Sequence, residues 1–570
     1  MNKQFKTVQS PKISRSRMNL SHRRVLSADP FLLYPVLVEP CIPGDKWKIS
    51  HNVKIRMSPL AAPIYHNLWA TIHNFFVPYR LLIKDWEKYI TAGKRGKLEP
   101  DMPRNNPREI HRTNNIIDDY RPTQDENWYI DGGIADHLGF TTAKNATELN
   151  NKGGIRKHPS VIPYRAYMKI WFDYYRAPDV QHSQEELVDL ISDLNLPIDE
   201  FEALDWIDTA DTPYLHDPSQ PPESGTFIRG LRARAWEKDY FTSMLPFQQR
   251  GEAPAFQITG QSTKTSFTGT TSLGAAASDT AAMILNSTPA NLSINVNSPG
   301  YNAGDLLKRW LENNVVPLNN LGIFDINDLR YGVQLQRFLE TMSRGGYRYK
   351  EMLLNVWGVN NKDERMQRAE YIGGIKFPIA ISEVLQTSES SGEPLGTMGG
   401  HGISYSSNKA GSHYCTEHGI IMGILSIMPD PLYQQGIERE WTKESRYELF
   451  MQMFQNLGEQ AVMGHELYNY GPETNDPIIG YIPRYDEYRH RRSSVHGLFK
   501  NDYAYWHMGR IFSNQPTLNQ DLIRPSRNEI YNLKRVMAIP SEPMFLIDMA
   551  NICDTVRPMP WMGIPGLMDH

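Results

Sequence analysis

The sequence predicts a mainly β protein, an antiparallel β-domain wrapped in long loops with several short helices. From Trp47 to Met57 every second residue belongs to a mostly apolar set, the period of a strand with one buried and one solvated face. Ile420–Met428 is a continuous apolar run, too short to span a bilayer, and indicates a fully buried strand. The 39 prolines and 40 glycines favour many strands and loops over a helical bundle. Eight strands of about six residues use only about fifty residues, so an eight-stranded jelly roll would leave most of the chain in its connections.

Residues 1–30 are polar, basic and without periodicity, so we expect an extended or disordered arm. No acidic residue precedes Asp29. The cations that precede it are Lys3, Lys6, Lys12, Arg15, Arg17, Arg23 and Arg24. Without these seven, the 60 basic residues of the chain fall to 53 against 64 acidic ones, so the formal charge of −4 conceals a concentrated positive segment. Such a segment is typical of polyanion binding, and we hypothesise that the arm contacts nucleic acid.

Strands are expected in order along residues 31–80. Phe31–Ile42 predicts a short strand whose prolines suit a sheet edge. The strand from Trp47 to Met57 has a basic solvated face, which includes Lys46, Lys48, Lys54 and Arg56. His66–Val77 is rich in aromatic and β-branched residues and predicts a neighbouring strand that Pro78 ends. Because such a pair cannot stand alone in water, the rest of the chain must supply a second sheet or helices to cover it.

Apolar residues at helical spacing predict several helices. One has Pro163 at its first position and ends at Ala177-Pro178. Another is capped by Asp328 and stopped by Gly345-Gly346, with an apolar stripe formed by Leu335, Phe338, Leu339 and Met342. Further helices are expected at Gln184–Leu194, Tyr349–Trp357 and Glu444–Leu457. From Ile478 onward the pattern again indicates strand and loop.

The composition changes sharply in the middle of the chain. Ala253 to about Pro299 is dominated by Thr, Ser, Ala, Gly and Asn with few charges, which indicates an insertion displayed on the surface. At 570 residues the chain exceeds the size at which a single core usually stops growing, so either several domains or one heavily elaborated domain is expected.

The sequence contains no familiar catalytic or cofactor signature: no GxSxG elbow, GxxxxGK[ST] loop or HExxH, and no GxGxxG after a strand. We therefore expect no catalytic residue and no cofactor. His413, Glu417 and His418 have the residue types of a metal site, but on a strand the two histidines would point to opposite faces, which disfavours a metal. Three dispersed cysteines without a CxxC pattern fit a reducing cytoplasm. No apolar segment follows the basic N-terminus, so neither a signal peptide nor membrane insertion is expected.

Two internal stretches interleave basic and aromatic residues, as nucleic-acid surfaces often do. One contains Arg229, Arg232, Arg234 and Trp236. The other runs from Arg484 to Arg492 and contributes Arg489, Arg491 and Arg492 as candidate nucleic-acid contacts. A subunit interface or a solvated strand edge is the favoured alternative for each stretch. We interpret the adjacent carboxylates Asp486 and Glu487 as plain surface charges rather than acid-base groups.

Nine blocks in order resemble one family, the major capsid proteins of the microviruses, and within it the gokushovirus-like group. They begin with IPGDKWKI together with FFVPYRLLIKDWEKYI, IPYRAYMKIWFDYYR and RAWEKDYFTSMLPFQQRG. They continue with LQRFLETMSRGGYRYKEML, RMQRAEYIGG with ISEVLQTS, and TEHGIIMGILSIMPDPLYQQGIEREW. LGEQAVMGHELY, GYIPRYDEYRHRRSSVHGLF and RPMPWMGIPGLMDH complete the set.

The resemblance implies a viral-capsid β-sandwich, an eight-stranded antiparallel jelly roll with long insertions. Such proteins assemble into a T=1 icosahedral shell around circular single-stranded DNA. It also implies four parts: an arm at 1–30, a first part of the jelly roll at 31–251, a threefold protrusion at 252–324, and the remainder at 325–570. The expected partners are other copies of the chain, the DNA genome, other phage structural proteins and a host-cell receptor. The expected location is the virion, assembled in the host bacterial cytoplasm.

Two other classes of function stay open at this stage. A β-sandwich carbohydrate-active enzyme would suit the aromatic residues and scattered carboxylates, but it needs two carboxylates facing each other across a cleft, and no spacing indicates such a pair. A solitary single-stranded DNA-binding protein would bind DNA compactly without forming shells. The structural hypothesis is favoured over both.

Overall fold

The structure is a computed structural model. It describes residues 14–83, 131–144, 162–176, 231–251, 283–288, 291–296, 326–345, 349–360, 362–385, 398–472, 476–525 and 527–562, with single positions between 86 and 180. The chain divides into two compact units. One comprises Met1–Gln248 with Gly345–His570, and the other comprises Gln249–Arg344. The predicted helix Gln184–Leu194 lies outside the described residues.

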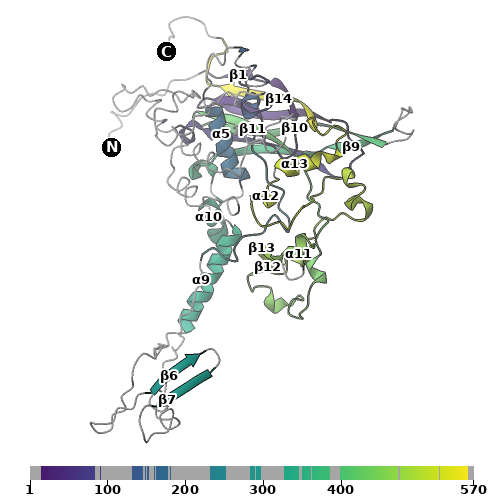
Figure 1. Cartoon of the computed structure of the whole chain (residues 1–570). Helices are drawn as coiled ribbons and strands as arrows, with labels where there is room; N and C mark the ends of the chain where they lie inside the picture. Colours follow the sequence, from purple (N-terminus) through teal and green to yellow (C-terminus); the bar gives the residue numbers. More distant parts are fainter. Residues whose placement is uncertain are drawn as a thin grey trace, which may run out of the picture. The chain divides into compact units, whose positions relative to one another are not determined.

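The first unit is built on two antiparallel sheets (Figure 1). A six-stranded sheet has the order β1-β14-β4-β10-β9, and β2 also pairs with β14. Its strands are β1 (Ser16–Asn19), β2 (His22–Ala28), β4 (Lys46–Met57), β9 (Ala380–Leu385), β10 (Met398–Tyr414) and β14 (Phe545–Arg557). A four-stranded sheet has the order β3-β11-β5-β8. Its strands are β3 (Tyr34–Cys41), β5 (Leu68–Pro78), β8 (Glu370–Pro378) and β11 (Gly419–Pro429).

The strand pairs are nested, which identifies the fold. Of the eight strands concerned, the first pairs with the last (β2 with β14) and the second with the seventh (β3 with β11). The third pairs with the sixth (β4 with β10) and the fourth with the fifth (β5 with β8). Successive pairs alternate between the two sheets, which is the jelly-roll arrangement of two four-stranded layers. The predicted fold class is confirmed, with β1 and β9 added to one layer.

One predicted pairing is wrong. β4 and β5 are not neighbours, because β4 belongs to the six-stranded sheet and β5 to the four-stranded sheet. The positions of both strands match the prediction, but the proline-containing connection between them crosses from one layer to the other instead of closing a hairpin. A second sheet covers the apolar face of β4, and β5 is part of that sheet.

The main core lies between the two layers. Trp47, Ile49, Val53 and Ile55 of β4 are at most 1% exposed, as the alternation predicts. At the centre of the same row is His51, whose Nδ1 lies 2.9 Å from Asn551 Oδ1 and whose Nε2 lies 3.1 Å from Asn74 Oδ1. Because Asn551 is on β14 and Asn74 on β5, this buried polar group links the two sheets. Burial lowers the pKa of His51, although both asparagine hydrogen bonds act to raise it.

The outer face of the four-stranded sheet is also covered. Helix α5 (Ile162–Ile170), which continues as a π-helical turn (Trp171–Tyr175), packs against β11 and β5 (Figure 1). The Phe75 ring lies 4.8 Å from that of Tyr174, and His73 Nδ1 lies 2.8 Å from the Tyr175 hydroxyl. β11 is therefore buried along its whole length, so both the predicted buried strand and the helix at Pro163 are confirmed.

Other helices are short, and one prediction fails. They are α3 (Ile134–His137), α10 (Tyr349–Trp357), α11 (Gly464–Leu467), α12 (Gln520–Ile523) and α13 (Arg527–Leu533). The predicted helix at Tyr349–Trp357 is confirmed as α10. The predicted helix at Glu444–Leu457 is wrong, because this segment forms turns with one 3₁₀ turn at Gln452–Phe454. Its backbone is instead held by contacts from residues outside the segment, such as the Tyr485 hydroxyl.

A second, smaller core lies beside the sandwich within the same unit. The strands β12 (Glu459–Met463) and β13 (Ile478–Pro483) pair antiparallel. Their apolar residues pack with Phe241, Met244 and Tyr433 into a separate buried cluster. This core positions the segments before and after it, which include both the 441–457 turns and the arginine-rich 484–492 stretch.

The second unit contains a hairpin and a helix. β6 (Met283–Thr288) pairs antiparallel with β7 (Asn291–Val296). Helix α9 (Ile326–Gly345) begins two residues before the predicted capping residue Asp328 and ends at the predicted stop. Most of the proposed insertion at 252–324 lies outside the described residues, so its role as a protrusion stays a prediction.

The sequence predicts an extended or disordered arm at residues 1–30, but the second half of this segment is part of the six-stranded sheet. Residues 16–19 and 22–28 form β1 and β2, which pair with β14 at one side of the six-stranded sheet. The pairing partner lies more than 500 residues later in the chain, so no local pattern could reveal it. Residues 1–13 lie outside the described residues.

Candidate nucleic-acid interface

The outer face of the six-stranded sheet, which we call the basic sheet face, is solvated and basic. On β4 the outward positions alternate with the buried ones and include Lys46, Lys48, Lys54 and Arg56. Residues two apart on a strand are about 6.8 Å apart, so Lys46 and Lys48 form one cationic pair and Lys54 and Arg56 another. No outward position of β4 carries an acidic residue.

Neighbouring strands extend the basic sheet face. The register places Arg17 of β1 and Arg23 of β2 on it, and Lys409 of β10 lies opposite Ser50. Two exposed tyrosines lie in the same rows: Tyr405, which is 71% exposed, is opposite Lys54, and Tyr414 is opposite Lys46. Lys46 Nζ is 5.9 Å from the centre of the Tyr414 ring, a cation-π contact. Cations with accessible aromatic rings are the residue types that bind single-stranded nucleic acid.

Two carboxylates on β14 partly neutralise the basic sheet face. Arg17 donates to Asp554 in a bidentate pair, with Nε to Oδ1 at 2.5 Å and Nη2 to Oδ2 at 2.6 Å. Arg23 donates to both carboxylate oxygens of Asp548 in the same way. These hydrogen bonds lower the pKa of both aspartates. The outward positions of β1, β2, β4, β10 and β14 thus carry seven basic and two acidic residues, a clear positive excess.

The predicted arm cations have several different environments. Lys3, Lys6 and Lys12 lie outside the described residues. Arg15 donates to the Gly44 carbonyl at 3.0 Å, and Arg17 and Arg23 lie on the basic sheet face. Arg24 lies on the opposite face of β2 from Arg23, and its Nη1 donates to the His137 carbonyl at 2.8 Å. Burial lowers the pKa of Arg24, so it is a structural cation rather than an exposed one.

Sequence reasoning missed five members of this site: Lys46, Lys48, Lys54, Arg56 and Lys409. The alternation along β4 indicates a basic solvated face, and this was the available signal. What the sequence lacked was the sheet order, which brings Arg17, Arg23 and Lys409 alongside the β4 cations.

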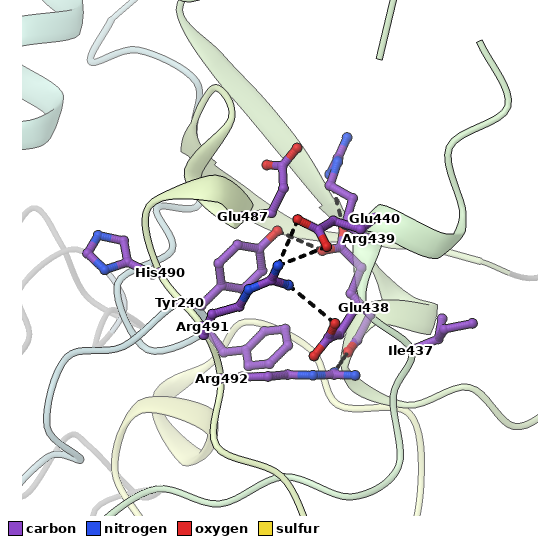
Figure 2. A pocket seen from close by; sticks show the side chains of 11 residues that line it. Tyr240, Ile437, Glu438, Arg439, Glu440, Glu487, His490, Arg491 and Arg492 are labelled. Carbon is purple, nitrogen blue, oxygen red and sulfur yellow. Dashed lines mark hydrogen bonds and ion pairs between the residues drawn. The ribbon is translucent and has the colours of Figure 1, made fainter. Parts of the chain in front are cut away.

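The arginine-rich stretch 484–492 forms a separate ionic cluster (Figure 2). Arg491 lies between two carboxylates, with Nη2 3.0 Å from Glu440 Oε2 and Nη1 3.4 Å from Glu438 Oε2. Arg492 donates to the Glu466 and Gly436 carbonyls at 2.6 and 2.9 Å. Arg489 pairs with Asp486 at 3.5 Å. Each of the three predicted contacts therefore has a protein partner, and the structure does not place them on the basic sheet face.

The interpretation of Asp486 and Glu487 as surface charges is wrong, because each is only 6% exposed. Glu487 accepts from Gln460 Nε2 at 2.7 Å and pairs with Lys443 at 2.9 Å. Burial would raise the pKa of Glu487, but these hydrogen bonds outweigh it and lower the pKa. The pair is part of the internal structure of the smaller core.

The other interleaved stretch is internal as well. Trp236 is 2% exposed, and Arg232 is buried with its guanidinium 5.0 Å from the Trp171 ring. Arg234 donates to the Ser426 hydroxyl at 2.8 Å, and Arg229 lies outside the described residues. Neither an exposed nucleic-acid surface nor a solvated edge describes these residues, because they attach the chain to the covered face of the four-stranded sheet.

The residues considered for a metal have other contacts. Glu417 accepts from Arg80 Nε at 2.9 Å, the His413 ring lies 4.8 Å from that of Phe76, and His418 meets Trp86 edge-on at 5.7 Å. Within the described ranges no group of three or more His, Cys, Asp or Glu could hold a metal ion. All three cysteines are free and buried.

Comparison with known proteins decides the family. A family model described as "Capsid protein (F protein)" matches residues 6–567. The chain belongs to this capsid protein family. Capsid protein VP1 of Chlamydia phage 1 is 29% identical over 627 aligned positions, which cover 100% of this chain and 98% of that protein. Capsid protein VP1 of Bdellovibrio phage phiMH2K is 28% identical and that of Spiroplasma virus 4 is 24% identical, with at least 96% of each chain covered.

The predicted resemblance to microvirus capsid proteins is therefore confirmed. The capsid protein has a structural role, is not an enzyme and is a component of the virion. Membership of a capsid family also implies assembly of many copies into a shell. In the part of the chain that the structure describes, no helix is both long and apolar enough to cross a membrane.

Proposed function

We propose that this capsid protein assembles into a closed T=1 icosahedral shell around circular single-stranded DNA, and that the basic sheet face binds the DNA. The observation that supports the DNA proposal is the charge of one exposed sheet face, which has seven basic residues and two acidic ones. The T=1 geometry and the circular genome rest on the resemblance to microvirus capsid proteins.

The chemistry of the basic sheet face suits a flexible strand better than a duplex groove reader. Its cations come in pairs spaced along β4, so they can neutralise successive phosphates without reading sequence. Tyr405 and Tyr414 can stack on bases, and such stacking is tolerant of sequence because every base has a π-face. A shell protein that encloses a whole genome requires this kind of sequence-independent binding.

Salt dependence of DNA binding tests the DNA proposal. A variant that replaces Lys48, Lys54, Arg56 and Lys409 by Gln removes four of the seven cations. Each phosphate contact to a single strand contributes about −0.7 to the slope of log K against log salt concentration, so the slope should become shallower by about 3. This slope is obtained by titrating the protein with an unlabelled poly-dT oligonucleotide at several salt concentrations and measuring the quenching of the protein's intrinsic fluorescence.

Lys500→Gln supplies the matched control, because Lys500 is an exposed lysine outside this sheet. Its slope should change by less than 1. If the four-site variant and the control have the same slope as the unmodified capsid protein, the basic sheet face does not bind DNA and the proposal fails.

The arm requires a more careful test than removal of residues 1–24. Such a deletion would also remove β1 and the first three of the seven residues of β2, and would expose part of the β14 edge. Deletion of residues 1–13 removes Lys3, Lys6 and Lys12 and keeps both strands. We expect this deletion to make the slope shallower by about 2 and to leave the melting temperature unchanged. An unchanged slope would exclude the three lysines from DNA binding.

Assembly is tested by electron cryo-microscopy of the purified protein, alone and with its phage partners. Regular shells with T=1 symmetry are the expected result. Small monodisperse species under all assembly conditions would contradict it. The proposal further includes assembly in the host cytoplasm, contacts with other phage structural proteins and a receptor-binding protrusion at residues 252–324.

A further inference from the structure

The segment 441–457 exposes an unusual amount of apolar surface, formed by six residues that we call the 441–457 patch. Trp441 is 73% exposed, Met453 88% and Leu457 62%, and Tyr447, Leu449 and Phe450 are each at least half exposed. Six large apolar side chains exposed to this extent present on the order of 500 Å² of apolar surface. A patch of this size is comparable to the largest apolar patch on a typical monomeric protein, and such patches are often binding sites.

The segment that carries the 441–457 patch is anchored by contacts to residues 485–487. Lys443 pairs with Glu487 at 2.9 Å, and both side chains are at most 6% exposed. The Tyr485 hydroxyl donates to the Leu449 carbonyl at 3.1 Å, and the Phe450 ring lies 5.2 Å from that of Tyr485. Local turns add hydrogen bonds such as Phe454 N to the Met451 carbonyl at 2.9 Å. These anchors fix the backbone while the six apolar side chains stay at least half exposed, so the surface is preorganised for binding.

The sequence pattern of this segment conflicts with its structure. Its apolar residues recur at helical spacing, and a helix would gather them into one stripe, yet the segment forms turns. A local preference that the fold overrides indicates that another interaction stabilises the observed conformation. The anchors to Tyr485 and Glu487 supply part of that interaction, and burial of the patch by a partner would supply the rest.

The composition of the patch matches the centre of a permanent protein interface. Trp, Tyr, Phe and Met are the residues enriched there, and they carry most of the binding energy. Polar residues on the same segment, Arg446, Gln452, Gln455 and Asn456, are exposed and can form a hydrated rim. About 500 Å² of apolar core with such a rim approaches the roughly 800 Å² per partner of a standard interface.

We infer that the 441–457 patch binds a second copy of this capsid protein and forms one of the subunit contacts of the shell. The inference rests on the proposed assembly into a shell. In a shell of a capsid protein, the neighbours of each subunit are other copies of the same chain, so another copy is the partner available to this surface. The contact is apolar at its centre, so its strength should depend little on salt, unlike DNA binding by the basic sheet face.

Charge substitution tests the contact. Met453→Asp places a carboxylate at the most exposed residue of the patch, and it should leave the melting temperature of the subunit unchanged. We expect it to raise the subunit concentration needed for assembly by at least about 30-fold, the effect of losing one interface hot spot. Gln452→Asp adds the same charge at the polar rim and should raise that concentration less than about fivefold, and Met453→Leu should assemble normally. Assembly of Met453→Asp at the unmodified concentration would overturn the inference.

A labelling measurement does not depend on how the aspartate variant behaves. Met453→Cys introduces a thiol at an exposed position, while the three native cysteines are buried. Maleimide should label this thiol rapidly in free subunits and at least tenfold more slowly in shells formed from this chain alone. Equal labelling in both states would overturn the inference, as would protection only in particles that contain another phage protein. If the unmodified protein forms no shells at all, the proposed assembly fails instead, and the two failures are therefore distinguishable.

Discussion

The two sheets of the sandwich differ in what lies on their outer faces. The four-stranded sheet is covered, since Ile424 and Met422 of β11 are at most 1% exposed and His73 lies under Tyr175. The six-stranded sheet is open to solvent at the equivalent positions, where Tyr405 is 71% exposed. The inner faces of both sheets pack into the same core.

This difference separates the structural and the functional surface of one fold. The covered face requires apolar residues on both sides of β11, which is why that strand has no alternation. The open face retains strict alternation on β4 and is free to carry charge for a partner. One layer of the jelly roll therefore contributes stability on both of its faces, and the outer face of the other layer is the surface that we propose binds DNA.

The largest expected effect comes from placing a charge on the covered face. Ile424→Asp buries a carboxylate without a partner, which should cost more than about 5 kcal/mol and prevent folding. Tyr405→Asp places the same group on the open face and should change the free energy of unfolding by less than about 1 kcal/mol. Soluble yield and thermal unfolding measure both. Similar behaviour of the two variants would show that the faces do not differ in the way described.

An intermediate effect is expected where the layers are joined. His51→Leu leaves Asn74 and Asn551 without their shared partner in the core, which should lower the free energy of unfolding by about 3 kcal/mol. His496→Leu, at an exposed histidine, should change it by less than about 0.5 kcal/mol. Chemical denaturation of the two variants gives the comparison. A loss for His51→Leu no larger than that of the control would mean that the polar link adds nothing to stability.

A smaller effect should depend on pH. Burial, together with the nearby Arg234, lowers the pKa of His73 to about 4, below its ordinary value near 6.5. Between these values the unfolded chain binds more protons at this residue than the folded chain does. The contribution of neutral His73 to stability is therefore fully present above about pH 6.5 and is lost as the pH falls toward 4. We expect protonation of His73 to lower the free energy of unfolding by about 2 kcal/mol over this pH range. His73→Phe should remove that part of the pH dependence. An unchanged pH profile in His73→Phe would contradict the assignment.

The carboxylates of the open face should respond differently. The pKa values of Asp548 and Asp554 are lowered by their arginine partners, so these groups stay charged while His73 titrates.

The smallest effect on folding is expected from these two carboxylates. Asp548→Asn with Asp554→Asn releases Arg23 and Arg17 from exposed ion pairs, which contribute little to stability. The melting temperature should stay nearly constant, while affinity for poly-dT at low salt should rise about tenfold because two negative charges leave the basic sheet face. Unchanged affinity would indicate that these arginines do not reach the DNA.

The sequence alone determined which residues share a face. The alternation from Trp47 to Met57 predicted both the buried row and the basic row of β4, and the apolar run predicted β11. Such patterns are local, since strand and helix periods depend only on the geometry of the backbone. The ordered blocks, read together, also gave the family.

The tertiary structure decided which strands are neighbours and which cations remain exposed. β4 and β5 lie in opposite layers, and the first strands pair with the last, as the Arg17 pair with Asp554 illustrates across 537 positions of sequence. It also decided that 444–457 forms turns around Tyr485 instead of a helix, and that Asp486 and Glu487 are buried. Pairing and burial depend on contacts between distant parts of the chain, and no local period encodes those contacts.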